Sequence, residues 1–171
     1  MTFRVSEKLN AKIKIGTLKA KPLDENPFAD WSAHLFVADQ TQYVIVSNTK
    51  SFYSTVMYGK GITNGRQFID RAFSSVREFM EEDGQAFLYH QFIAPSGGTI
   101  RFAKALDRVV TGSIKQLVGL ATALLVEREL SPFDVGFKLN DMWLSAIASN
   151  GSEKYGKPRE AFKASMNSVE S

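Results

Sequence analysis

Residues 31 to 58 constrain the fold most, because three β-branched and aromatic runs follow one another with short polar breaks between them. The runs read WSAHLFVA, YVIVS and FYSTVMY, and the breaks read DQTQ and NTKS. Runs of this composition separated by short turns are typical of neighbouring antiparallel strands. The pattern therefore predicts a β-meander.

Alternation along these runs sorts their side chains onto two faces of a sheet. We expect Phe36 to pair with Ile45 and Ile45 to pair with Ser54, and a slip of one residue would exchange the faces. Both faces are largely apolar, so helices or a second subunit should cover each. One face should carry His34, Phe36, Tyr43, Ile45, Phe52 and Val56, and the other Leu35, Val37, Val44, Val46, Tyr53 and Met57.

Short extended patterns flank the meander on both sides. TFRVSE and AKIKIG alternate as strands near the N-terminus, and TIRFAKA predicts a further strand after the PSGG turn. Between them, apolar residues at steps of three and four predict a helix over residues 68 to 80, with Gly84 as its C-terminal cap. QAFLYHQFIA fits a helix or a strand, and we favour a helix.

The C-terminal third is mostly helical in pattern. We expect a helix capped by Ser113 and running to about Glu127, and a second that begins at the Ser-Pro of SPFDVGFKL. Residues 151 to 157 should form a loop, PREAFKASM a short helix, and residues 163 to 171 a polar tail. The order of elements predicts a single α+β domain over residues 1–171, with an antiparallel meander sheet packed against four to five α-helices.

Composition excludes several classes of protein. The chain has 171 residues, enough to bury a core without added cross-links, and no cysteine, which excludes disulfides, thiolate zinc sites and cysteine nucleophiles. The first 16 residues contain no secretory apolar run, and the longest nearly apolar stretch, residues 117 to 126, is too short to span a membrane. We expect a cytoplasmic protein with no membrane segment.

Positive charge is concentrated at the N-terminus. Residues 1 to 21 carry a charge of +5, and residues 22 to 30 carry −3. Such a basic arm could bind a nucleic acid, but lysines also protect an exposed edge strand from pairing, and we favour that interpretation. The basic residues are Arg4, Lys8, Lys12, Lys14, Lys19 and Lys21.

Motifs for established catalytic chemistries are absent from the sequence. His34 and His90 are the only histidines, no G-x-S-x-G motif is present, and GKGITNGR lacks the spacing of a phosphate-binding loop. No calcium-loop pattern or pair of strand-end carboxylates indicates a metal, so we expect neither metal nor cofactor. We interpret His34 as a half-buried side chain of the sheet rather than a catalytic base.

The best candidate for a binding site is RFAKALDRVVTGS, residues 101 to 113. It reads as a strand, a polar hinge and a helix start, and free N–H groups at residues 114 to 116 beside a nearby arginine would attract an anion. The alternative, which we favour, is a well-capped helix start in which Asp107 and Arg108 pair with each other or hold the loop to a neighbouring carbonyl. The candidate anion-binding residues are Arg101, Lys104, Asp107, Arg108, Gly112 and Ser113.

Four short motifs resemble a bacterial protein family of unknown function. They are WSAHL at 31 to 35, DRVVTGS at 107 to 113, LND at 139 to 141 and YGKPREAF at 155 to 162. Relatives of this kind show W-H-A-N-L, N-R-S-V-L-G-S-M-N-D and L-N followed by Y-P. Val109, Lys115 and Gln116 depart from that pattern. The resemblance implies a fold type and a focal region but no reaction, and it matches at Trp31, Ala33, Leu35, Arg108, Val110, Gly112, Ser113 and Asn140.

Three functional hypotheses remain open from the sequence. The first is a binding or regulatory domain that acts through a protein partner or through homodimerisation, which two apolar sheet faces favour. The second is a small enzyme or anion-binding protein in which Arg101, Lys104 and Arg108 hold a phosphorylated or carboxylated ligand, with Asp107 or His34 moving a proton. The third is a nucleic-acid-binding or nuclease-like protein of a mobile element or toxin system, based on basicity and size. Trp31, His34 and Asn140 are further candidate site residues.

Overall fold

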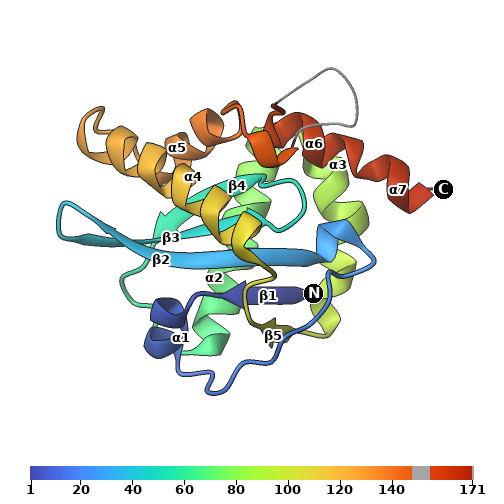
Figure 1. The fold of residues 1–171 in the computed structure, drawn as a ribbon, viewed down its shortest axis with the longest axis horizontal. Coiled ribbons are helices and arrows are strands. Elements are labelled where there is room, and N and C mark those ends of the chain that lie inside the picture. The colour runs from blue at the N-terminus through green and yellow to red at the C-terminus, as the bar shows by residue number, and fades with distance from the viewer. Residues whose placement is uncertain (148–154, 171) are drawn as a thin grey trace.

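A mixed five-stranded sheet organises the protein in the computed structural model, which describes residues 1–147 and 155–170 (Figure 1). The strand order is β4-β3-β2-β1-β5. β1 runs parallel to both β2 and β5, whereas β2, β3 and β4 are antiparallel to one another. The α+β fold and the meander are confirmed, but a purely antiparallel sheet was wrong. The strands are β1 Thr2–Val5, β2 Asp30–Ala38, β3 Thr41–Asn48, β4 Ser54–Tyr58 and β5 Arg101–Ala103.

The register of the meander differs by two residues from the one predicted. Phe36 pairs with Tyr43, and Ile45 pairs with His34 on one side and Val56 on the other. The first turn contains only Asp39 and Gln40, both with positive φ, so the hairpin is tighter than the DQTQ break indicated. A shift of two preserves which face each side chain occupies. The predicted division into two faces is therefore confirmed, although the pairing behind it was wrong.

The N-terminal region holds one strand rather than two. β1 forms as predicted, but AKIKIG falls largely within helix α1, Glu7–Ile13, and in the turn that ends it. Ser6 caps this helix by accepting the N–H of Leu9, and Ile13 is buried four residues further on. The spacing of Leu9 and Ile13 fits a helix as well as a strand, and the cap decides between them. β1 also lies inside the sheet, between β2 and β5, so a basic edge strand was wrong.

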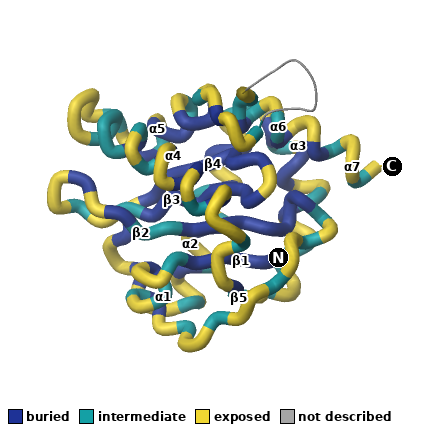
Figure 2. The backbone as a smooth tube through the Cα atoms, viewed as in Figure 1, coloured by how far each residue is buried: buried dark blue, intermediate teal, exposed yellow. Residues whose placement is uncertain are grey.

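Helices cover both faces of the sheet. On one face, α2 (Gly65–Glu82) packs on apolar residues of β1 to β4 together with α1 and α6 (Pro158–Ala164); we call this core cluster one. On the other face, α4 (Arg108–Val126) and α5 (Pro132–Leu139) pack on β2 to β4 and form cluster two. In Figure 1, α4 crosses in front of the sheet and α2 behind it. Figure 2 shows the strands between them buried for most of their length.

The remaining elements join α2 to β5 and close the C-terminal end. QAFLYHQFIA is helical, as favoured, and consists of α3 (Ala86–Leu88) and the single π-helical turn Tyr89–Ile93, followed by the 3₁₀ turn Ala94–Gly98. Gly84 ends α2 with a positive φ of 76°, which confirms its predicted role. The short helix predicted at PREAFKASM forms as α6, which ends at Ala164, and a further helix, α7, spans Met166–Glu170 within the predicted polar tail. Of the predicted loop, residues 151–154 lie outside the described residues.

α4 also satisfies the length and composition of a membrane-crossing helix. The expectation from the sequence considered only residues 117 to 126, whereas the helix is 19 residues long. Its inner face packs in cluster two through Val110, Ile114, Leu117 and Ala121. A single apolar helix with one face packed in this way also occurs in the cores of globular domains.

Candidate ligand-binding groove

The helix that follows β5 begins earlier than predicted. Asp107 is the N-cap of α4, and its carboxylate accepts the N–H of Val110 at 2.9 Å. Ser113 as the cap was therefore wrong, because it lies buried in the second turn. The N–H groups of residues 114 to 116 are inside the helix and bond within it, so they form no anion pocket.

The structure places the six predicted anion-binding residues on β5, on the segment after β5 and on the first two turns of α4. Arg101 is exposed on β5, Arg108 is exposed in the first turn of α4, and Gly112 lies on the outer side of that helix. A methyl group added at Gly112 would meet nothing within 4 Å, so no close contact requires a glycine there. Lys104, which follows β5, is the member of the set that lines a groove.

This groove lies between α1, α4 and the carboxyl ends of β1 and β5, and its volume is about 810 Å³. Ser6, Glu7 and Lys8 enter it directly after β1, and Lys104 and Ala105 directly after β5. Ligands of open α/β sheets commonly bind beyond the carboxyl ends of parallel strands. The other lining residues are Val5, Asn10, Leu18, His34, Leu35, Phe36, Thr111, Lys115 and Val118.

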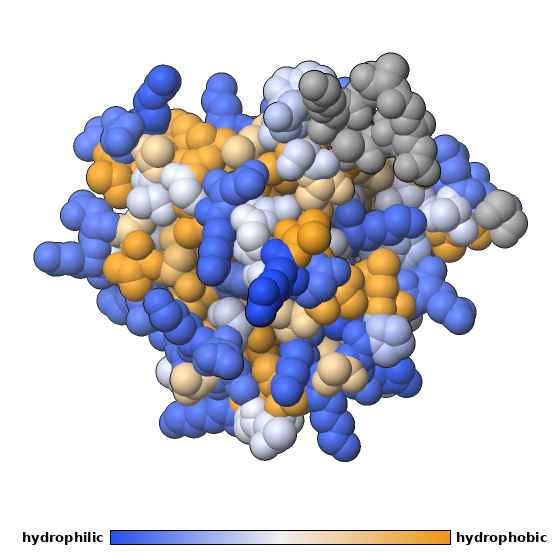
Figure 3. All heavy atoms as spheres, in the orientation of Figure 1, coloured by the Kyte–Doolittle hydropathy of each residue, from blue (hydrophilic) through white to orange (hydrophobic). Residues whose placement is uncertain are grey.

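Unequal strand lengths create the opening. β1 pairs with β2 only as far as Ala33, where Val5 ends the parallel ladder, but β2 continues to Ala38. His34 and Phe36 therefore extend beyond the end of β1, on the sheet face that α4 partly covers. Figure 3 views the molecule from the side of α4, and there hydrophilic and apolar surfaces are interspersed.

Three lysines from three different elements reach the groove. Lys8 belongs to α1, Lys104 follows β5, and Lys115 belongs to α4. Within residues 1–147 and 155–170, none of them forms an ion pair or a side-chain hydrogen bond. Three lysines against the single carboxylate of Glu7 give the groove a net charge of +2 when His34 is neutral.

His34 is neutral at pH 7. Burial lowers its pKa to about 4, and the positive charge of Lys115 adds to that effect. Its imidazole forms no hydrogen bond with another described residue, so it offers one donor and one acceptor to the groove. His34 was predicted to be a half-buried side chain of the sheet, and that is confirmed.

Two other polar residues of the groove are already engaged. The Ser6 hydroxyl accepts the N–H of Leu9 at the start of α1. The Asn10 side chain donates to the carbonyl of Gly16 at 2.7 Å and accepts the N–H of Ile15 at 3.1 Å. These side chains shape the wall of the groove, whereas the lysines and His34 remain available to a ligand.

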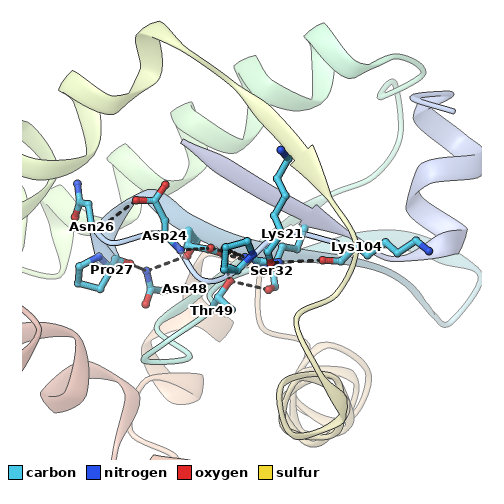
Figure 4. Close-up of polar contacts among 11 residues, drawn as sticks. Lys21, Asp24, Asn26, Pro27, Ser32, Asn48, Thr49 and Lys104 are labelled. Carbon is cyan, nitrogen blue, oxygen red and sulfur yellow. Dashed lines mark hydrogen bonds and ion pairs between the residues drawn. The ribbon is translucent and has the colours of Figure 1, made fainter. Parts of the chain in front are cut away.

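A buried ion pair fixes the sheet beside the groove (Figure 4). Arg4 donates from Nε and Nη2 to the two carboxylate oxygens of Asp30 at 2.9 and 2.8 Å, and both side chains are almost completely buried. The remaining Arg4 donors bond the carbonyls of Lys21, Pro22 and Lys104. Asp30 also accepts from Thr49 at 2.7 Å. Every N–H group of the Arg4 side chain has an acceptor, so this network anchors Lys104 directly after β5 and the loop at Lys21 and Pro22 before β2, and it leaves no free charge.

A second charged cluster ties helices together far from the groove. Asp83, at the end of α2, accepts from the Tyr53 hydroxyl at 2.7 Å and from Arg159 of α6 at 2.9 Å. Arg159 also pairs with Asp141, just beyond α5. Burial raises the pKa of Tyr53, and its hydrogen bond to Asp83 adds to the shift. Because its charges are mutually paired, this cluster is a structural tie.

Trp31 and Asn140 do not contribute to the groove. The indole N–H of Trp31 donates to the carbonyl of Phe28 at 2.8 Å, and the ring packs against Phe162 in cluster one. The Asn140 amide donates to the carbonyl of Ser54 at 2.9 Å and accepts its N–H at 2.7 Å. It thus acts as an additional strand residue beside β4. Both positions matched the family pattern, and both have a structural role here.

Sequence reasoning missed Lys8 and Lys115 as site residues. Lys8 was counted only within the basic N-terminus, and Lys115 only as a departure from a motif. No local signal joins them to Lys104, since they meet through the parallel pairing of β1 with β5 and the packing of α4 on β2. Among the described residues, no three His, Asp or Glu side chains gather as metal ligands would.

Comparison with known proteins identifies a family for the chain. Residues 2–161 match the family described as a domain of unknown function, DUF6933. No curated protein and no solved structure matches. The match confirms the resemblance to a family without an assigned function, and it covers β1 through the middle of α6. The chain therefore belongs to the DUF6933 family.

Proposed function

We propose that this protein binds a small organic anion in the groove between α1, α4 and the carboxyl ends of β1 and β5. The observation that carries the proposal is a set of three lysines, from three elements, around one groove with apolar walls, none of which has an ion-pair partner among the described residues. A volume of about 810 Å³ lies within the range of roughly 300 to 1,000 Å³ that holds most small ligands.

The lysines support binding because their backbones are fixed by the fold and do not belong to a flexible arm. The backbone N–H of Lys104 donates to the carbonyl of Lys19 at 3.0 Å, and its carbonyl accepts from Arg4. Lys115 extends from a helix whose opposite face is buried in cluster two. Like charges gathered without partners repel one another, so an anion that relieves this repulsion binds favourably.

The two other hypotheses have less support from the fold. Helices of the chain itself pack on both faces of the sheet, so the apolar faces of the described strands do not by themselves require a protein partner. The nucleic-acid hypothesis depended on six basic residues in positions 4 to 21, and Arg4 is buried in an ion pair. An anion-binding groove needs neither feature.

Isothermal titration calorimetry with phenyl phosphate tests the proposal. We expect measurable binding that weakens as salt rises, and a loss of roughly tenfold in affinity for Lys104→Gln or Lys115→Gln, since each removes one charge contact of about 1 to 2 kcal/mol. Lys163→Gln, an exposed lysine of α6 outside the groove, is the matched control and should bind normally. Equal binding by all three variants would contradict the proposal.

A further inference from the structure

The groove combines two chemically different surfaces. Its walls include apolar side chains from the sheet, from the loop before β2, from the segment after β5 and from α4. Its charged groups are the three lysines and Glu7. Such a combination fits a ligand with an apolar body and an anionic group better than it fits a bare inorganic ion. The apolar lining residues are Val5, Leu18, Leu35, Phe36, Ala105 and Val118.

The charge and the donor type favour a phosphate monoester over a carboxylate. A phosphate monoester carries a charge of about −1.5 to −2 at pH 7 and has three strong acceptor oxygens, which match a net charge of +2 and three separate lysines. The planar fork of an arginine matches carboxylate and phosphate alike, whereas lysine acts as a point charge and is a common phosphate ligand. Arg101 and Arg108 lie outside the lining of the groove.

His34 is placed to respond to such a ligand. It lines the groove on β2, with Lys115 acting on it from α4, Lys8 and Glu7 lining the groove from α1, and Lys104 from the segment after β5. Cations outnumber carboxylates around it, and burial also opposes a charge there. A bound dianion would neutralise this net positive charge and place negative oxygens beside the imidazole, which favours its protonated form.

We infer that the ligand is a phosphate monoester with an apolar body, and that below pH 7 its binding is coupled to the uptake of a proton from solvent by His34. The inference rests on the proposed function and adds the chemical class of the ligand and the proton linkage. The protonated imidazole then donates to a phosphate oxygen as a fourth cationic contact, and the apolar body packs on Leu18, Leu35 and Val118.

The first experiment separates the anionic group from the apolar body. Calorimetry at pH 7 compares phenyl phosphate, inorganic phosphate and benzoate. Burying a phenyl ring contributes about 1.5 to 3 kcal/mol, so phenyl phosphate should bind about tenfold or more tightly than inorganic phosphate. It should also bind more tightly than benzoate, whose single charge leaves one lysine uncompensated. Equal affinity for phenyl phosphate and inorganic phosphate, or tighter binding of benzoate, would overturn the inference.

The second experiment measures the proton. Phenyl sulfate keeps one charge between pH 5 and 7, so any change in its binding over that range comes from the protein. An anion close to a histidine raises the pKa of that histidine by roughly one to three units, so we expect phenyl sulfate to bind about tenfold more tightly at pH 5 than at pH 7. His34→Gln should abolish this dependence, and His90→Gln, the other histidine, should retain it.

A direct measurement supports the second experiment if a variant folds poorly. The His34 ring resonances of the wild type, followed by NMR from pH 3.5 to 8 with and without phenyl sulfate, should titrate at higher pH with the ligand present. An unchanged titration would overturn the proton linkage. If phenyl phosphate binds, but phenyl sulfate shows neither pH-dependent binding nor a shift in the His34 titration, the groove is an anion site and only the present inference is contradicted. Absence of binding by every probe would instead contradict the proposed function.

Discussion

At the scale of single residues, His34 links stability to pH even without a ligand. Burial lowers its pKa to about 4 in the folded protein, whereas an unfolded chain has a histidine pKa near 6.5. The unfolded state therefore binds more protons between these two values, and the stabilising effect of the neutral imidazole is lost as pH falls from about 6.5 to 4. We expect the wild type to lose about 3 kcal/mol more than His34→Gln over this window.

Urea unfolding of both proteins at pH 7, 5.5 and 4 measures this difference. Carboxylates lose stability in both chains alike, so only the difference between the two proteins reports on His34. A constant difference across the three pH values would show that the imidazole is solvated like that of the unfolded chain.

Asn140 acts at the same scale through two hydrogen bonds. Its amide pairs with both the N–H and the carbonyl of buried Ser54, and the side chain itself is fully buried. Asn140→Ala leaves two backbone groups of β4 without partners, at roughly 1 to 3 kcal/mol each. We expect the free energy of unfolding to fall by about 2 to 4 kcal/mol, measured by chemical denaturation.

The exposed Asn167 of α7 provides the control for that substitution. Asn167→Ala removes the same amide from the surface and should change stability by less than about 0.5 kcal/mol. Similar losses in the two variants would indicate that Asn140 contributes no more than a surface side chain.

At the scale of elements, the start of α4 distinguishes two caps. Asp107 accepts the N–H of Val110, while Ser113 lies inside the helix. Asp107→Ala should cost about 1 kcal/mol, Asp107→Asn should restore most of it, and Ser113→Ala should change stability less than Asp107→Ala does. Thermal or urea unfolding of the three variants shows which of the two residues caps α4. A larger loss for Ser113→Ala would place the functional cap where the sequence first indicated.

This misassigned cap shows what the sequence could and could not predict about elements. The meander, α2, α5 and α6 have strong periodicity, and their existence was predicted. Sequence alone does not decide where two local signals compete. Asp107 and Ser113 compete as the cap of α4, and a strand pattern competes with the cap at Ser6 over the residues of α1. The structure uses the caps at Ser6 and Asp107, because Leu9, Ile13 and Val110 are then buried.

At the scale of the whole molecule, the parallel pairing had no local signal. Thr2 pairs with Arg101 across most of the chain, and no turn joins β1 to β5. Lys104 was selected from its own neighbourhood, but its partners Lys8 and Lys115 follow only from that pairing and from the packing of α4 on β2. The candidate groove is thus a product of topology, whereas the two apolar faces of the meander were readable from alternation alone.

The sheet shared by clusters one and two also determines how the molecule unfolds. β2, β3 and β4 contribute alternate side chains to both clusters, and α5 packs in cluster two through Val135 and against cluster one through Phe133. Neither cluster can lose its sheet face while the other keeps one. We therefore expect a single cooperative transition for the whole chain.

Leu117→Ala tests that coupling from the side of cluster two. Leu117 is fully buried in α4, and its truncation should cost about 2 to 5 kcal/mol. In a Trp143→Phe background, buried Trp31 becomes the sole tryptophan and reports on cluster one. We expect Leu117→Ala to lower the urea midpoint equally by Trp31 fluorescence and by far-UV circular dichroism. A fluorescence midpoint that stays in place while the dichroism midpoint falls would show two independently unfolding cores.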